Sequence, residues 1–147
     1  MLVPTPPPAY SAAAPTQAEL AIVREINRVR RAHHVRGVRL DVSLARVARK
    51  HSVEMLQHDT LTHSSFDGRS FSTRLAGAGR HRQYGETLAW APDGSGVTAK
   101  NLLNLWMRSA PHRAVLMNGK LRRVGVGRVL GAMGAQRGNA ITADFSS

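Results

Sequence analysis

Apolar residues recur at helical spacing in two stretches of the first half of the chain. In the first stretch, Thr16 and Glu19 form a capping-box pattern ahead of a series of apolar residues, which predicts a helix over residues 17–34. The second stretch opens after Asp41. One face of the helix that it predicts carries Leu44, Val47, Ala48, His51 and Met55. Because His51 falls inside this apolar stripe, we interpret it as a core histidine with a local hydrogen-bond partner.

The middle of the chain combines a short helical pattern with an extended one. Residues 71–76 predict a short helix that ends at a pair of glycines. Residues 84–90 predict a strand, in which alternation places Glu86 on the same face as Leu88 and Trp90. A carboxylate on an apolar face is costly unless it is paired or hydrogen-bonded, so Glu86 is the acidic residue most suited to a site.

A further helical pattern leads directly into a proline and a histidine. Its apolar face carries Leu102, Leu105, Trp106 and Ser109. Pro111 lacks a backbone donor and disfavours helix at the residue before it, so we expect the helix to stop there. His112 then lies just beyond a helix end, between Trp106 and an apolar run at residues 115–117. A histidine held in this way is either a site residue or a packed loop residue.

The last part of the chain predicts two strands. Residues 124–130 and 140–145 show strand-like patterns, and the glycine-rich stretch 131–138 is expected to join them as the loop of an antiparallel hairpin. The order of the predicted elements favours an α+β fold with helices covering a small antiparallel sheet.

Composition limits the kinds of protein that the chain encodes. Its 147 residues, 42% hydrophobic and 20% charged, suit one domain with a core, assigned to residues 17–147 after a Pro/Ala-rich tail at residues 1–16. The tail lacks the pattern of an intact secretory signal, so either a leader has been removed or export does not use that route. No apolar run is long enough to span a membrane, so the protein is not transmembrane. The chain has no cysteine for a disulfide or a thiolate metal site.

The net charge of +12 is the strongest compositional feature. Basic residues concentrate on the first two predicted helices, and the candidate surface is formed by Arg24, Arg28, Arg31, Arg46 and Arg49. Such a surface attracts phosphate or acidic polymers, although a solvated face or an arginine-rich genome explains it equally well. The few aromatic residues do not interleave with the basic run, so we expect no sequence-specific nucleic-acid partner.

Three residues from separate elements are the candidates for chemistry. The chain contains no Gly-x-Ser-x-Gly elbow, no His-Glu-x-x-His pattern and no phosphate-binding glycine loop. What remains is His63, Glu86 and His112. Two imidazoles and a carboxylate can ligate a divalent metal or act as a general acid and base.

Several short motifs in the chain resemble those of a known family. They are Leu61-Thr62-His63-Ser64, Gly85-Glu86-Thr87-Leu88-Ala89, Trp106-Met107 with Ser109, Pro111-His112-Arg113 and Leu116-Met117-Asn118, and Val124-Gly125-Val126-Gly127. In this order they closely resemble the CAP (SCP/TAPS) superfamily of cysteine-rich secretory proteins, antigen 5 and plant pathogenesis-related proteins, in its cysteine-free bacterial type. The resemblance covers roughly residues 17–147.

The resemblance implies an α-β-α sandwich with a central cleft lined by two histidines and two acidic residues. His63 matches the first histidine, Glu86 one acid and His112 the second histidine. Thr87 stands where asparagine is usual, and Ser109 replaces the second acid, which reduces the negative charge available for a metal. We therefore expect the cleft to contain His63, Glu86, Ser109 and His112. No cofactor is required, and Zn²⁺ or another divalent cation is the ion that His63, Glu86 and His112 would hold.

Three functions follow from these observations. The favoured one is a secreted or envelope-associated, monomeric binding module with a His/Glu cleft for a cation or a small, lipid-like ligand. The second is a metal-dependent hydrolase at the same cleft. The third is an adhesion module whose basic helices bind anionic envelope polymers or lipids.

Overall fold

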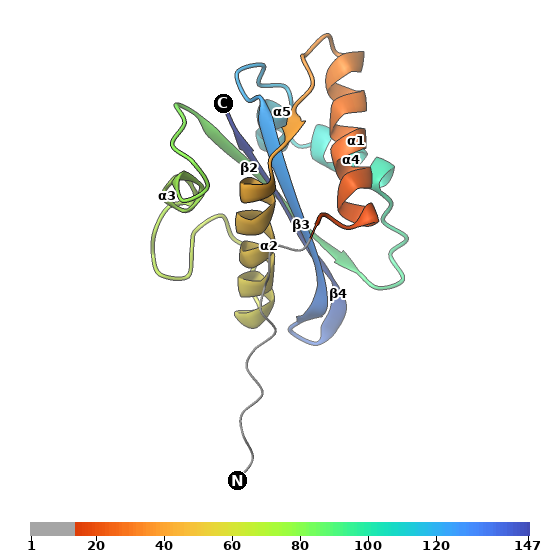
Figure 1. The fold of residues 1–147 in the computed structure, drawn as a ribbon. Coiled ribbons are helices and arrows are strands. Elements are labelled where there is room, and N and C mark those ends of the chain that lie inside the picture. The colour runs from red at the N-terminus through yellow and green to blue at the C-terminus, as the bar shows by residue number, and fades with distance from the viewer. Residues whose placement is uncertain (1–13) are drawn as a thin grey trace.

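The computed structural model describes residues 14–147, which form a four-stranded sheet with helices on both faces (Figure 1). The strands are β1 (Arg39–Leu40), β2 (Tyr84–Pro92), β3 (Arg123–Met133) and β4 (Gln136–Ser146). The helices are α1 (Gln17–Ala32), α2 (Val42–Gln57), α3 (Phe71–Ala76), α4 (Ala99–Met107) and α5 (Ala110–Leu116). The predicted α+β class with α-β-α layering is confirmed. Most of the predicted tail, residues 1–13, lies outside the described residues.

The strands lie in the order β1-β3-β4-β2, so β2 is an edge strand. β2 and β3 both pair with β4 in antiparallel fashion, whereas β1 pairs with β3 in parallel. β1 has only two residues and therefore shows no alternation from which it could be predicted. The predicted loop over residues 131–138 was wrong. The strands continue to Met133 and resume at Gln136, because Gly134 adopts a φ of 60° that permits a two-residue connection.

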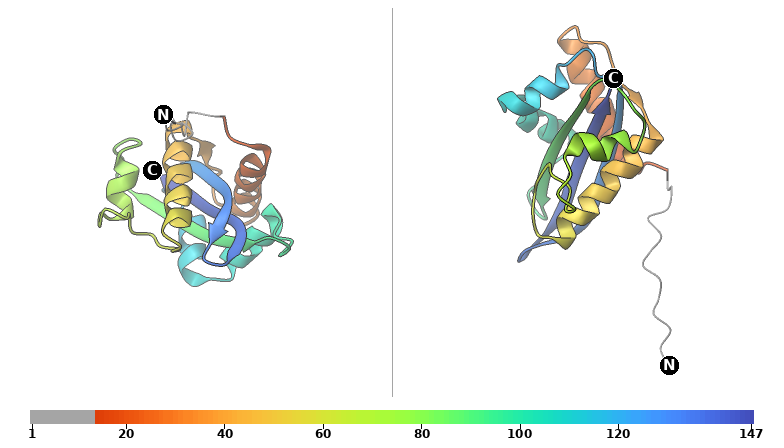
Figure 2. Two further views of the ribbon diagram at one scale, coloured as in Figure 1. Left: turned by 90° about the horizontal axis from the view of Figure 1, so that it is seen from below. Right: turned by 90° about the vertical axis from the view of Figure 1, so that its left-hand side faces the viewer.

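One face of the sheet lies directly against α2. A Cβ atom at Gly125 would lie 2.0 Å from the backbone nitrogen of Ala45, and one at Gly127 would lie 2.3 Å from the backbone of Arg49. Only glycine permits this close approach. In the right-hand view of Figure 2, α2 and α3 lie on one side of the strands and α4 and α5 on the other.

The main core lies between the other face of the sheet and helices α1, α4 and α5. Its central buried side chains are Ile22, Ile26, Leu102, Leu103, Trp106, Leu116, Val124, Val126, Ile141 and Phe145. A smaller cluster on the α2 side contains Met55, Leu88 and Ala140. Leu88 therefore faces α2, and so does Glu86, which lies two residues earlier on the same strand.

The predicted start of α1 is confirmed by its cap. The Thr16 hydroxyl accepts a hydrogen bond from the Glu19 backbone at 3.2 Å, and the Glu19 carboxylate accepts one from the Thr16 backbone at 2.9 Å. This is the reciprocal pair of a capping box. The helix ends at Ala32, two residues before the predicted end.

The prediction for His112 was wrong in one respect. As expected, α4 ends at Met107, ahead of Pro111. A new helix, α5, then begins at Ala110 with the proline in its first turn, where a missing N–H group costs nothing. His112 therefore lies inside a helix and not in a loop.

A buried arginine fixes the far end of α5. Arg30 of α1 is fully buried, and its guanidinium donates to the carbonyls of Leu116 at 2.8 Å, Leu121 at 2.9 Å and Arg36 at 2.8 Å. Burial lowers its pKa, and the positive charge of Arg122 lowers it further. The arginine thus ties α1 to the segment between α5 and β3.

His51 is a core residue, as predicted. It is fully buried in α2, and its Nε2 donates to the carbonyl of Thr62 at 2.7 Å. This bond holds the loop that carries His63 against α2. Among the helices of residues 14–147, none is long and apolar enough to cross a membrane.

Candidate functional site

The site is built around Glu86 on β2, whose side chain is fully buried. The Nδ1 atom of His63 donates to one carboxylate oxygen at 2.9 Å. The Nη1 atom of Arg74 donates to the other oxygen at 2.7 Å. Both oxygens of Glu86 are thus satisfied by protein groups, as a buried carboxylate requires.

Arg74 connects α3 to the loop that carries His63 and to the carboxyl groups of the sheet. Its Nη2 donates to the carbonyl of His63 at 2.9 Å, and its Nε donates to the Ser65 hydroxyl at 3.1 Å. Its Nη1 also lies 3.5 Å from a carboxylate oxygen of Asp144. One guanidinium therefore fixes the histidine loop and neutralises Glu86 together. The sequence analysis missed Arg74, because nothing in a six-residue helix shows that its one arginine turns toward the site.

Asp144 is the second acidic residue of the site and was also missed. It lies on β4, in register with Glu86 on β2, and is fully buried. The signal that could have found it is the one that singled out Glu86, a carboxylate in an otherwise apolar strand.

The two carboxyl groups are driven to opposite protonation states. Burial and the negative charge of Glu86 raise the pKa of Asp144 well above its ordinary value. Burial would also raise the pKa of Glu86, but contacts with His63, Asp144 and Arg74 outweigh it and lower this pKa to about 2. Asp144 therefore holds its proton to higher pH than Glu86, and the negative charge of the pair lies first on Glu86, opposite the positive charge of Arg74.

His63 and His112 differ in their surroundings. The side chain of His63 is 52% exposed and lies beside Phe71, with ring centroids 6.1 Å apart. The ring of His112 lies against Trp106 with centroids 6.3 Å apart, and its buried Nδ1 has no hydrogen-bond partner among the described residues. Burial lowers the pKa of His112, and the charge of His63 lowers it further. His63 thus joins Glu86 directly, whereas His112 lies near enough to His63 for the charge of that residue to affect its pKa.

Neither Ser109, the remaining residue expected in the cleft, nor Thr87 forms a side-chain hydrogen bond with Glu86. Ser109 precedes α5 and is half-buried, but its side chain does not cap that helix. Thr87 points to the opposite face of β2 from Glu86, and its buried hydroxyl has no hydrogen-bond partner within residues 14–147. The indole of Trp106 donates to the carbonyl of Leu88 at 2.9 Å and so covers the edge of β2.

The predicted metal set does not fit this geometry. Within residues 14–147, no group of three histidine, aspartate or glutamate side chains is placed to hold a metal ion. Both oxygens of the Glu86 carboxylate already accept hydrogen bonds, from His63 and Arg74, so a cation would compete with these two groups for that carboxylate. Metal binding by His63, Glu86 and His112 stays a prediction without support from the geometry.

Comparison with known proteins identifies the family. The model of the CAP family, the cysteine-rich secretory protein family, matches residues 23–145. The chain belongs to the CAP family. A comparison with curated proteins gives no match.

Solved structures share the CAP fold of this chain. An outer surface protein from Borrelia burgdorferi is 20% identical with a TM-score of 0.73, over 90% of this chain and 96% of that one. An extracellular protein containing an SCP domain from Bacillus anthracis is 24% identical with a TM-score of 0.68, and the match spans 91% of this chain but 45% of that one. Venom allergen-like protein 4 of Schistosoma mansoni is 12% identical with a TM-score of 0.65, over 90% and 89% of the two chains. At these identities the likeness shows the fold alone.

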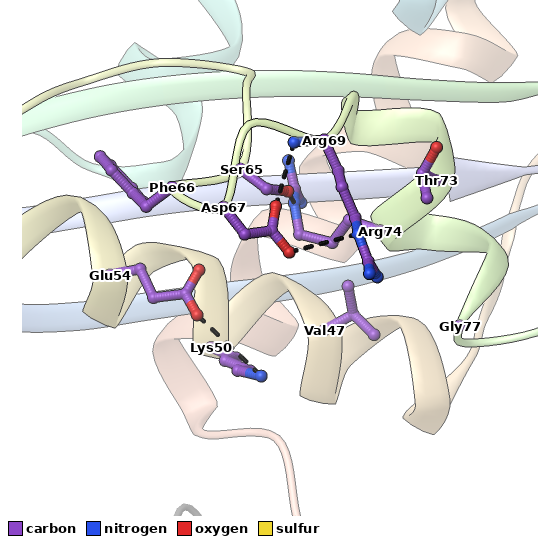
Figure 3. A pocket seen from close by; sticks show the side chains of 10 residues that line it. All are labelled: Val47, Lys50, Glu54, Ser65, Phe66, Asp67, Arg69, Thr73, Arg74 and Gly77. Atoms are coloured by element: carbon purple, nitrogen blue, oxygen red, sulfur yellow. Dashed lines mark hydrogen bonds and ion pairs between the residues drawn. The ribbon is translucent and has the colours of Figure 1, made fainter.

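A cavity of about 380 Å³ opens beside the Glu86 site of this CAP domain (Figure 3). It lies between α2, α3 and the loop before α3, and Arg74 and Ser65 belong to its wall. Its other lining residues are Val47, Lys50, Glu54, Phe66, Asp67, Arg69, Thr73 and Gly77. Apolar groups, cations and carboxylates therefore face one small space.

The predicted basic surface is only partly exposed in this CAP domain. Arg24, Arg31 and Arg46 are exposed, and Arg28 is exposed but pairs with Glu25 at 2.8 Å. Arg49 does not belong to the surface, because its side chain is 18% exposed and pairs at 2.6 Å with buried Glu19. Binding of anionic polymers by the remaining arginines stays a prediction.

Proposed function

We propose that this CAP domain is a secreted or envelope-associated binding module that holds a small ligand and catalyses no reaction. The observation that carries the proposal is the full engagement of Glu86 by Arg74 and His63. Glu86 and Arg74 therefore have a structural role, because they hold helix α3 and the loop that carries His63 in place.

The ionisation states support a non-catalytic role. A general base works best when its pKa lies near the working pH, but the pKa of Glu86 is lowered to about 2. Asp144 is fully buried behind Arg74, where a substrate does not reach it. A metal-dependent hydrolase would need protein ligands that hold a metal with one coordination position open for water, and the Glu86 carboxylate of the expected ligand set is already bonded to His63 and Arg74.

The cavity beside Arg74 is the place that we propose for the ligand. Its volume of about 380 Å³ lies within the range of small-molecule sites. Val47 and Phe66 provide apolar contact, while Lys50 and Glu54, 4.0 Å apart, offer opposite charges on one helix. This lining suits a small amphiphile with an apolar body and one charged group.

Similarity to known proteins supports the proposed location. Two structural relatives are described as an outer surface protein and an extracellular protein. We extend that location to this chain as part of the proposal.

Binding of simple amphiphiles tests the proposal. Hexanoate and hexylamine each join an apolar tail to one charge, and titration of either should shift the backbone NMR signals of Ser65, Phe66 and Thr73. Val47→Trp fills the cavity and should abolish these shifts. Val42→Trp, at an exposed position at the start of the same helix, should leave them unchanged.

Two results would contradict the proposal. Binding that survives Val47→Trp would place the ligand elsewhere. Hydrolysis of p-nitrophenyl acetate that requires both Zn²⁺ and His63 would favour the hydrolase alternative.

A further inference from the structure

A second cavity, of about 450 Å³, lies at the N-terminal end of β2, far from the turn that joins β3 and β4. Three basic side chains line it. Arg82 precedes β2, whereas Lys120 and Arg122 belong to the segment between α5 and β3. The remaining lining residues are Gln83, Gly119 and Ser147. No acidic side chain lines this cavity, and the one negative group among its lining residues is the terminal carboxylate of Ser147.

Backbone hydrogen bonds hold the walls of the cavity together. The backbone of Arg122 donates to the Ser146 carbonyl at 2.8 Å, and that of Ser147 donates to the Gln83 carbonyl at 3.0 Å. The backbone of Arg82 donates to the Ser147 hydroxyl at 3.1 Å. Three chain segments are thus fixed to one another, so the cations are placed before any ligand binds.

The chain has no acidic side chain left to neutralise these cations. It contains nine acidic residues. Seven of them form ion pairs with other basic residues: Glu19, Glu25, Asp41, Glu54, Asp67, Glu86 and Asp93. Asp144 lies 3.5 Å from Arg74, and burial raises its pKa. The ninth, Asp59, accepts a hydrogen bond from the Gly134 backbone at 2.7 Å.

A buried arginine, Arg30, adds to the positive charge at this cavity. Neither Arg82, Lys120 nor Arg122 forms an ion pair with any residue in the range 14–147. Arg122 lies close enough to buried Arg30 for its charge to act on that guanidinium, which has only carbonyl partners. Four cations thus lack an acidic side chain as partner, and a ligand that carries negative charge would be attracted.

From this arrangement we propose that the cavity formed by Arg82, Lys120 and Arg122 binds a phosphate group. Two guanidinium groups offer paired donors that match phosphate oxygens, and the lysine adds a point charge. Three positive charges favour a phosphate over a singly charged carboxylate. The cavity shares no residue with the predicted basic surface or with the cavity beside Arg74, so the phosphate site stands or falls independently of the proposed small-ligand function.

Titration of the protein with inorganic phosphate tests the site. At constant ionic strength, phosphate should shift the backbone NMR signals of Gln83, Lys120 and Arg122, whereas sodium chloride should not. The double variant Arg82→Gln with Lys120→Gln changes two exposed side chains and should weaken binding by about tenfold or more. Arg122→Gln should weaken it further, and thermal denaturation will show whether that half-buried position affects folding.

A control variant with the same change in charge distinguishes a specific phosphate site from general attraction by the positive net charge of the protein. Arg24→Gln with Arg31→Gln removes the same charge from exposed positions on α1 and should leave phosphate affinity within about twofold. Equal weakening by both double variants, or no weakening by the first, would overturn the proposal.

Vesicles identify the source of the phosphate. Phosphatidylglycerol vesicles that bind the wild type but not Arg82→Gln with Lys120→Gln would assign a lipid headgroup. Inorganic phosphate binding that depends on these residues, without a matching effect on vesicles, would assign a soluble phosphate compound.

Discussion

Arg74 Nη1 lies 2.7 Å from Glu86 Oε2, and this ion pair gives the carboxylate the partner that its place on an apolar face requires. The same guanidinium donates to the carbonyl of His63, so the pair sets both the charge and the shape of the site.

Loss of Arg74 should destabilise the fold. Arg74→Gln leaves the buried Glu86 carboxylate without its cation, and we expect the free energy of unfolding to fall by about 3 kcal/mol at neutral pH. Arg69→Gln removes an exposed ion pair with Asp67 in the same region and should change stability little. Urea denaturation of both variants measures the difference. Equal stabilities would show that Glu86 does not depend on Arg74.

Acid should destabilise the protein in a defined window. The pKa of Glu86 is lowered from 4.5 to about 2, so its ionised form contributes stability above pH 4.5. That contribution is lost as the pH falls from 4.5 through about 2. Chemical denaturation at several pH values should show the decline in the wild type and a shallower one in Glu86→Gln. Identical slopes would contradict the assigned pKa.

The local parts of the fold were predictable, because short-range patterns determine them. Thr16 and Glu19 start α1 through contacts three residues apart, and the sequence analysis placed that start correctly. The core position of His51 followed equally well from its helical stripe.

The partners of Glu86 depend on long-range geometry, and the sequence did not reveal them. Asp144 lies beside Glu86 only because β2 and β4 pair in one particular register. Arg74 reaches the site only because α3 packs against β2. For the same reason, Arg49 was predicted to be exposed, although it pairs with buried Glu19 of a different helix.

Asp144 should behave as a neutral residue in the folded protein. Its pKa is raised well above 3.8, so the protonated acid contributes stability at low pH that is lost as the pH rises through the raised pKa. Asp144→Asn imitates the protonated form and cannot titrate. We therefore expect this variant to gain stability relative to the wild type as the pH rises above about 4. A constant difference between the two proteins across the pH range would contradict the protonation of Asp144.

Zn²⁺ affinity should increase when Arg74 is removed. In the wild type, both oxygens of Glu86 are engaged, so His63 and His112 have no free carboxylate to complete a ligand set. Arg74→Gln releases one oxygen and removes a positive charge that repels a cation. Calorimetry at neutral pH should show tighter Zn²⁺ binding by the folded variant than by the wild type, and circular dichroism checks the fold.

The gain in Zn²⁺ affinity should disappear at about pH 5, because protonated histidine does not ligate metal. It should also disappear when His63→Ala and His112→Ala are added to Arg74→Gln. If wild type and Arg74→Gln bind Zn²⁺ equally, the ion pair with Arg74 is not what keeps a metal from Glu86.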